Sequence, residues 1–138
     1  MNELMLHETH IVAKDGTLTR LVYDQEGDIL EIFFGDNVPA TGIELTDHIV
    51  LRVDRESQRA VSLLLLDFSI LTEQTLYGPR SFPLDNLDET SADLRELALQ
   101  LITSLPVSQF LKISHFQLSP VKQIPSAFVE TQLAFAPV

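Results

Sequence analysis

The stretch LTRLVYDQEGDILEIFF, residues 18–34, determines the predicted fold class. Two apolar segments, residues 18–23 and 28–34, flank the short polar segment 24–27, which ends in Gly27. Glycine adopts the left-handed conformation at little cost, and such a residue closes a three-residue hairpin loop. The stretch therefore predicts a β-hairpin with Gly27 as its left-handed residue.

The segments around this hairpin predict three more strands. Residues 10–13 are joined to 18–23 through Asp15-Gly16, a signal for a type I′ turn with positive φ at both central residues. Residues 48–53 alternate, with Ile49, Leu51 and Val53 on one face. Residues 60–66 form a nearly continuous apolar run, typical of a central strand covered on both faces. With residues 35–42 as a loop, we predict an antiparallel β-meander of about five strands.

The clearest helix lies between residues 90 and 106. Thr90 with Asp93 fits a helix-start signature, and Pro106 ends the helix because the residue before a proline avoids the α region. Segments 110–118 and 126–135 predict two further strands. We therefore expect an α+β fold: a meander, one amphipathic helix and a β-rich C-terminal extension. The buried stripe of the helix is expected to contain Leu94, Leu97, Ala98, Leu101 and Ile102.

Residues 72–89 lack a clean period and contain Gly78, Pro79 and Pro83. An irregular connection of this length is unusual within a compact domain. We therefore divide the chain into a meander at 1–71, a linker loop at 72–89, and a helix with two strands at 90–138. This last unit is expected to pack on the same domain or on a dimer partner.

The composition excludes several classes of function. The 138 residues carry a formal net charge of −11, which disfavours nucleic-acid binders and adhesion to anionic membranes. The chain has no cysteine, so disulfides, thiolate metal sites and cysteine nucleophiles are excluded. We expect a cytoplasmic protein with no signal peptide, no membrane span and no cofactor.

The charge is unevenly distributed along the chain. Residues 1–96 hold 19 acidic and 7 basic residues, or −12, whereas residues 97–138 carry +1 and remain rich in apolar side chains. Strands with so few charges promote pairing when exposed, so they are expected to complete this chain's core or to form a subunit interface. The candidate interface residues are Tyr77, Arg80 and Phe82 in the linker loop, and Phe128, Val129, Leu133 and Phe135 in the tail.

The acidic turn that contains Asp24, Glu26 and Asp28 is the only candidate cation site. Three carboxylates so close together suit Ca²⁺ or Mg²⁺, but such side chains more often cap turn backbone groups. The four histidines show no convergent ligand set, and no Gly-x-Ser-x-Gly turn or phosphate-binding glycine loop is present. The sequence therefore gives no support for an enzyme.

The segment Tyr23-Asp24-Gln25-Glu26-Gly27-Asp28, followed by an apolar strand, resembles the YuzE-like family of small proteins. The likeness covers residues 18–71 and continues through a strand that ends in Asp54 and the apolar strand 61–66. The matching motif residues are Tyr23, Asp24, Glu26, Asp28 and Asp54. This chain has Glu31, Ser62 and Leu64 where the family commonly has an aromatic residue, glycine and glutamate. The resemblance implies a small β-rich cytoplasmic fold without assigned activity, and an antitoxin-like partnership with a small toxin-like protein.

Three functional hypotheses remain open at this level. The first is a non-enzymatic protein that acts through protein–protein association as a homodimer. The second is an antitoxin-like partner of a small basic protein, which the acidic charge would attract. The third is a divalent-cation module or enzyme that uses the turn at residues 24–28.

Overall fold

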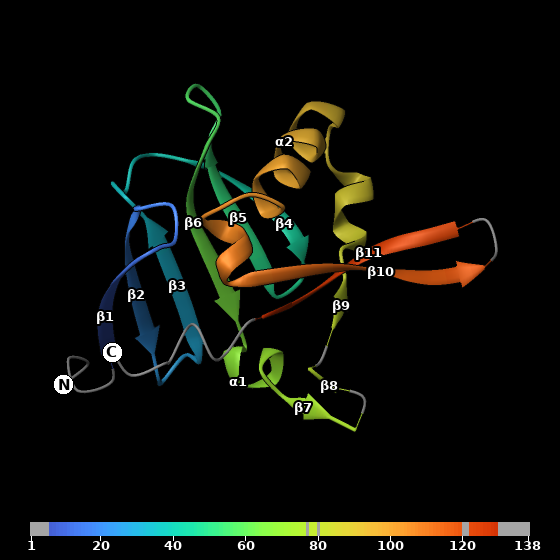
Figure 1. The fold of residues 1–138 in the computed structure, drawn as a ribbon, viewed down its shortest axis with the longest axis horizontal. Coiled ribbons are helices and arrows are strands. Elements are labelled where there is room, and N and C mark those ends of the chain that lie inside the picture. The colour runs from blue at the N-terminus through green and yellow to red at the C-terminus, as the bar shows by residue number, and fades with distance from the viewer. Residues whose placement is uncertain (1–5, 77, 80, 120–121, 130–138) are drawn as a thin grey trace.

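A six-stranded antiparallel sheet forms the centre of the computed structural model, which describes residues 6–76, 78–79, 81–119 and 122–129 (Figure 1). Its strands are β1 (Leu6–Val12), β2 (Leu18–Asp24), β3 (Ile29–Phe34), β4 (Thr41–Thr46), β5 (Ile49–Asp54) and β6 (Arg59–Leu66). Together with one main helix and a second, small sheet, this arrangement confirms the predicted α+β class.

The strands lie in the order β1-β2-β3-β6-β5-β4. Two three-strand meanders are thus joined by antiparallel pairing between β3 and β6, rather than forming one meander in chain order. The loop expected at residues 35–42 ends earlier, because Thr41 and Gly42 belong to β4, a strand that the sequence pattern did not predict. Ile43 and Leu45 alternate there with Gly42 and Glu44, but the short period-2 pattern directly follows a loop that contains Pro39.

Two hairpin turns differ from their predicted forms. In the β2–β3 turn the left-handed residue is Asp28, with φ 56°, and not Gly27. At Gly27 a Cβ would lie 3.0 Å from the Asp24 carboxylate, so a larger residue would make that side chain shift. In the β1–β2 turn only Gly16 has positive φ, and its N–H donates to the Ala13 carbonyl. A type I turn followed by a left-handed glycine therefore replaces the predicted type I′ turn.

One face of the sheet packs into the hydrophobic core against α2 (Ala92–Ile102) (Figure 1). Ile49, Leu51 and Val53 are fully buried there, as their alternation predicted. The predicted helical stripe is also confirmed: Leu97, Ala98 and Ile102 are buried, and Leu94 and Leu101 pack against the core. The helix begins after Ser91, however, because the Thr90 hydroxyl donates to the Asn86 carbonyl of the preceding turn.

The segment predicted as a linker loop contains short regular elements. These are β7 (Gln74–Thr75), β8 (Gly78–Pro79), β9 (Phe82–Pro83) and the 3-10 helix η2 (Asp85–Glu89), which follow α1 (Phe68–Leu71). Leu84 and Leu87 lie in the same core cluster as the strands of the large sheet. The segment thus packs against the core through one residue directly before η2 and one residue within it.

The C-terminal strands pair within the chain. After η3 (Val107–Gln109), β10 (Leu111–Ser119) pairs antiparallel with β11 (Lys122–Val129), which also pairs with β9. The predicted strand 110–118 is confirmed, whereas the strand predicted at 126–135 begins earlier, and its residues after 129 lie outside the described part. Within the described residues, no helix has the length and apolar character needed to cross a membrane.

Candidate functional site

The face of the large sheet opposite the core, here called the outer face, is the main candidate site. Because successive side chains of a strand alternate between faces, the pairing register places Arg20, Phe33, Ser62 and Arg52 in one row across β2, β3, β6 and β5. Most side chains of this face are half-buried or exposed. Its other described members include Leu6, Glu8, His10, Val12, Leu18, Val22, Glu31, Val50 and Leu64.

Three exposed apolar side chains lie on the β1–β2 side of the outer face. Leu6 is 49% exposed, Val12 64% and Leu18 72%. Val12 and Leu18 lie directly opposite each other in the β1–β2 pairing. Val12 and Leu18 thus form one exposed apolar pair, and Leu6 lies at the opposite end of β1.

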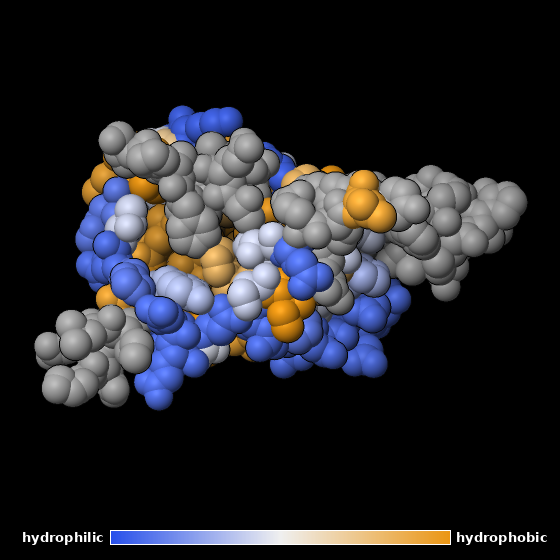
Figure 2. All heavy atoms as spheres, turned by 90° about the horizontal axis from the view of Figure 1, so that it is seen from below, coloured by the Kyte–Doolittle hydropathy of each residue, from blue (hydrophilic) through white to orange (hydrophobic). Residues whose placement is uncertain are grey.

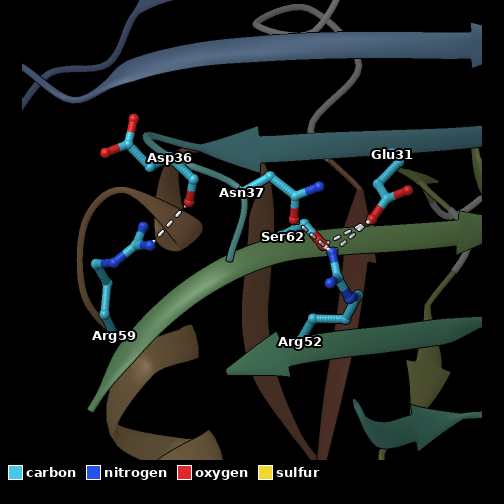
Figure 3. Close-up of polar contacts among 6 residues, drawn as sticks. All are labelled: Glu31, Asp36, Asn37, Arg52, Arg59 and Ser62. Carbon is cyan, nitrogen blue, oxygen red and sulfur yellow. Dashed lines mark hydrogen bonds and ion pairs between the residues drawn. The ribbon is translucent and has the colours of Figure 1, made fainter. Parts of the chain in front are cut away.

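A polar network crosses the middle of the outer face (Figure 3). The Arg52 guanidinium donates to the Glu31 carboxylate at 3.2 Å, to the Asn37 side-chain oxygen at 3.2 Å and to the Ser62 hydroxyl at 3.0 Å. The Ser62 hydroxyl in turn donates to Glu31 at 2.7 Å. About a quarter of each charged side chain is exposed, so the pair is shielded from water and mutually satisfied.

Sequence reasoning missed this network, although it named two of its members. Glu31 and Ser62 are two of the positions at which the chain departs from the YuzE-like pattern. The structure brings both to Arg52, so the two departures form one hydrogen-bonded unit. The sequence shows only that each of these three polar residues stands among apolar residues of a strand. Which of them are neighbours depends on the order of the strands in the sheet.

A second ion pair lies on the β1–β2 side of the outer face. Arg20 donates to the Glu8 carboxylate at 3.2 Å and stacks over the Phe33 ring at 4.3 Å from its centroid. The same carboxylate lies 3.7 Å from the His10 ring nitrogen. This part of the face therefore presents Glu8 and His10 to solvent beside the exposed apolar residues.

The acidic turn serves a structural role in this fold. Asp28 accepts hydrogen bonds from the Ser69 hydroxyl at 2.6 Å, the Ser69 N–H at 3.1 Å and the Tyr23 hydroxyl at 2.9 Å. Asp24 accepts from the Gly27 N–H at 3.2 Å. Asp54, the last motif residue, caps the β5–β6 turn through the Glu56 N–H. Tyr23, Asp24, Asp28 and Asp54 thus stabilise turns, and Glu26 is exposed.

The electrostatics of this turn follow from the same contacts. The Ser69 hydroxyl, followed by the Tyr23 hydroxyl, lowers the pKa of Asp28, and burial opposes this only in part. The hydrogen bond to Asp28 raises the pKa of Tyr23. Among the described residues, no three His, Cys, Asp or Glu side chains come together as a group that could hold a metal ion. Figure 2 shows the molecule from this side, where an apolar area lies beside hydrophilic side chains.

A cavity of about 700 Å³ lies between the β5–β6 turn and the end of α2. Arg59 lies at its rim, but its guanidinium donates to the main-chain carbonyls of Phe34 and, at 2.8 Å, of Asp36 (Figure 3). Arg59 therefore fixes the β3–β4 connection rather than offering a free cation. The cavity lining is apolar on one side, with Phe34, Ala60, Leu101, Pro106 and Val107, and carries Asp15 and Asp36 at the rim.

Three of the predicted interface residues are described, and they lie close together where β9 pairs with β11. Val129 is only 3% exposed and belongs to this chain's core, so it is not available to a partner. Phe82 and Phe128 are half-buried, and the Phe82 ring meets His48 edge-on at 6.2 Å. The remaining four candidates, Tyr77, Arg80, Leu133 and Phe135, lie outside the described residues.

Comparison with known proteins finds no matching family model, no matching curated protein and no matching solved structure. The likeness to the YuzE-like family therefore rests on the sequence motif alone.

Proposed function

We propose that this protein is a non-enzymatic, cytoplasmic association module that forms a homodimer through the β1–β2 side of its sheet. The observation that carries the proposal is the exposure of Leu6, Val12 and Leu18 on one face of these two strands. Burying apolar surface of this kind is the main driving force of protein association.

The polar residues of the same surface support association rather than catalysis. Arg20 and Glu8 are paired with each other, and Arg52 and Glu31 are paired at the centre of the face. Their geometry positions charges for complementary contacts, which give specificity at an interface. None of these four side chains belongs to the lining of the cavity.

Sedimentation equilibrium tests this proposal. We expect a concentration-dependent species of twice the chain mass of 15.5 kDa. Leu18→Lys is expected to raise the dissociation constant at least about tenfold, because a buried leucine contributes roughly 1.5–3 kcal/mol. Leu76→Lys is the matched control, since Leu76 is 99% exposed in the β7–β8 turn.

A monomer at every concentration would refute the proposal, and so would equal effects of the two substitutions. Point substitutions are preferable to truncation. Deleting residues 107–138 would remove Val107, Phe110 and Leu111 from the core and would unfold the chain.

A further inference from the structure

Within the part of the chain that the structure describes, the outer edge of β1 is open to strand pairing. In the sheet order β1 is a terminal strand, and no described strand pairs with its outer side. Six of its seven residues are exposed, and the seventh, Ile11, is half-buried. An exposed edge of this length presents main-chain groups to any strand of suitable sequence.

The hairpin geometry defines which main-chain groups point outward. The Ala13 N–H donates to the Thr17 carbonyl, so residue 13 directs its main-chain groups toward β2. Main-chain direction alternates along a strand, so the odd-numbered residues of β1 also face β2. The N–H and C=O groups of Leu6, Glu8, His10 and Val12 consequently point away from the sheet.

A second copy of the same strand fits this edge in one register. A two-fold axis at Thr9 would place Glu8 opposite His10 of the second copy and Leu6 opposite its Val12. All four outward-facing residues would then form hydrogen-bonded pairs. An axis at Glu8 would oppose two carboxylates, and an axis at His10 would leave Leu6 unpaired, so both registers are less favourable.

The register at Thr9 also accounts for the exposed apolar residues. Leu18 lies opposite Val12 within the chain, and Leu6 of the second copy would continue the same row across the axis. One apolar row of three side chains would thus form on each side of the axis. Between the two rows, Glu8 would meet His10 of the second copy while keeping its contact with Arg20.

We infer that two copies of this chain join their sheets edge to edge through antiparallel pairing of β1 about a two-fold axis at Thr9. The inference rests on the proposed homodimer and specifies its interface. The result is a continuous sheet of both chains, with the two outer faces on the same side.

Single cysteines test the register directly, because the chain has none of its own. Thr9 would lie opposite Thr9 of the second copy in a non-hydrogen-bonded pair, in which the two Cα atoms are about 4.5 Å apart. This distance is within the range that a disulfide can bridge. Thr9→Cys is therefore expected to form a covalent dimer under mild oxidation. His7→Cys is the control: it lies on the same face, but roughly 14 Å from its own copy at ~3.4 Å per residue.

Proline at an outward-facing position provides an independent measurement. His10→Pro removes an N–H that points away from β2, a place where edge strands tolerate proline, so the monomer is expected to fold. Sedimentation of this variant is expected to show a monomer, and its circular dichroism a native spectrum.

The outcomes separate this inference from the proposed function. A dimeric wild type with a cross-linked Thr9→Cys, no cross-link at His7→Cys and a monomeric His10→Pro supports the edge pairing. If the wild type is dimeric but Thr9→Cys does not cross-link and His10→Pro remains dimeric, the edge pairing is overturned and the proposed homodimer stands. A monomeric wild type overturns both.

Discussion

Asp28→Ala is expected to destabilise the fold by about 2–4 kcal/mol. Asp28 links the β2–β3 turn to α1, since its carboxylate accepts hydrogen bonds from Ser69, 41 residues along the chain, and from Tyr23. Its backbone is left-handed, with φ 56°. Alanine would remove the acceptor and retain the unfavourable backbone conformation.

The magnitude follows from these two contributions. Three hydrogen bonds contribute roughly 0.5–1.5 kcal/mol each, toward the lower end here because Asp28 is only half-buried. The left-handed conformation costs an alanine about 1 kcal/mol more than it costs a glycine. Asp28→Gly is therefore expected to be about 1 kcal/mol more stable than Asp28→Ala, and Asp28→Asn to lose least.

Urea denaturation followed by circular dichroism measures the free energy of unfolding of each variant. The comparison is valid where the slope against urea concentration stays constant. Tyr23→Phe removes one donor and should account for no more than about 1.5 kcal/mol. An Asp28→Ala variant within about 0.5 kcal/mol of wild type, or no gain from glycine, would refute the reasoning.

Three further predictions concern the same contacts and the central network. The Ser69 hydroxyl holds the pKa of Asp28 in the folded protein below the ordinary value of 3.8. The ionised Asp28 side chain therefore stabilises the fold fully above pH 3.8, and this stabilisation is lost as the pH falls through the lowered pKa of the folded protein. Urea melts should therefore show the wild-type advantage over Asp28→Asn shrinking below about pH 4. In a Tyr77→Phe background, Asp28→Asn should lower the raised pKa of Tyr23 toward 10.0, as measured by tyrosinate absorbance; an unchanged titration would contradict the hydrogen bond. Arg52→Met should cost about 1–3 kcal/mol in unfolding free energy, and Arg52→Met combined with Glu31→Leu should recover most of it; additive losses in this double-mutant cycle would count against a coupled pair.

Local patterns in the sequence predicted the parts of the fold that depend on local chemistry. Strand alternation identified the buried residues of β5, and apolar spacing identified the buried side of α2, because burial selects for these periods directly. The turn at Asp28 was predicted less well. Aspartate and glycine both tolerate the left-handed region, and the contact with Ser69 that favours aspartate comes from a distant segment.

The candidate site was less predictable, because its residues meet through strand pairing. Glu31 and Ser62 are neighbours only because β3 pairs with β6 and not with β4. Arg52 reaches both through the β5–β6 register. In each strand the polar residue stands between apolar neighbours, a pattern that is compatible with a solvated face. The pairing order turns three such residues into one network.

The same strand order determines which described strands lie at the two edges of the sheet. At one end η2 packs beside β4, and the Asn86 amide donates to Asp47 in the β4–β5 turn at 3.1 Å. At the other end is β1, whose sequence LHETHIV contains neither lysine nor proline, the residues that commonly protect an edge strand from pairing. The strand instead carries an acid and a histidine symmetrically about Thr9, with apolar residues at both ends. In antiparallel pairing with a second copy, each of these residues meets one of complementary charge or of apolar character. This strand therefore favours a second copy of itself over an unrelated strand.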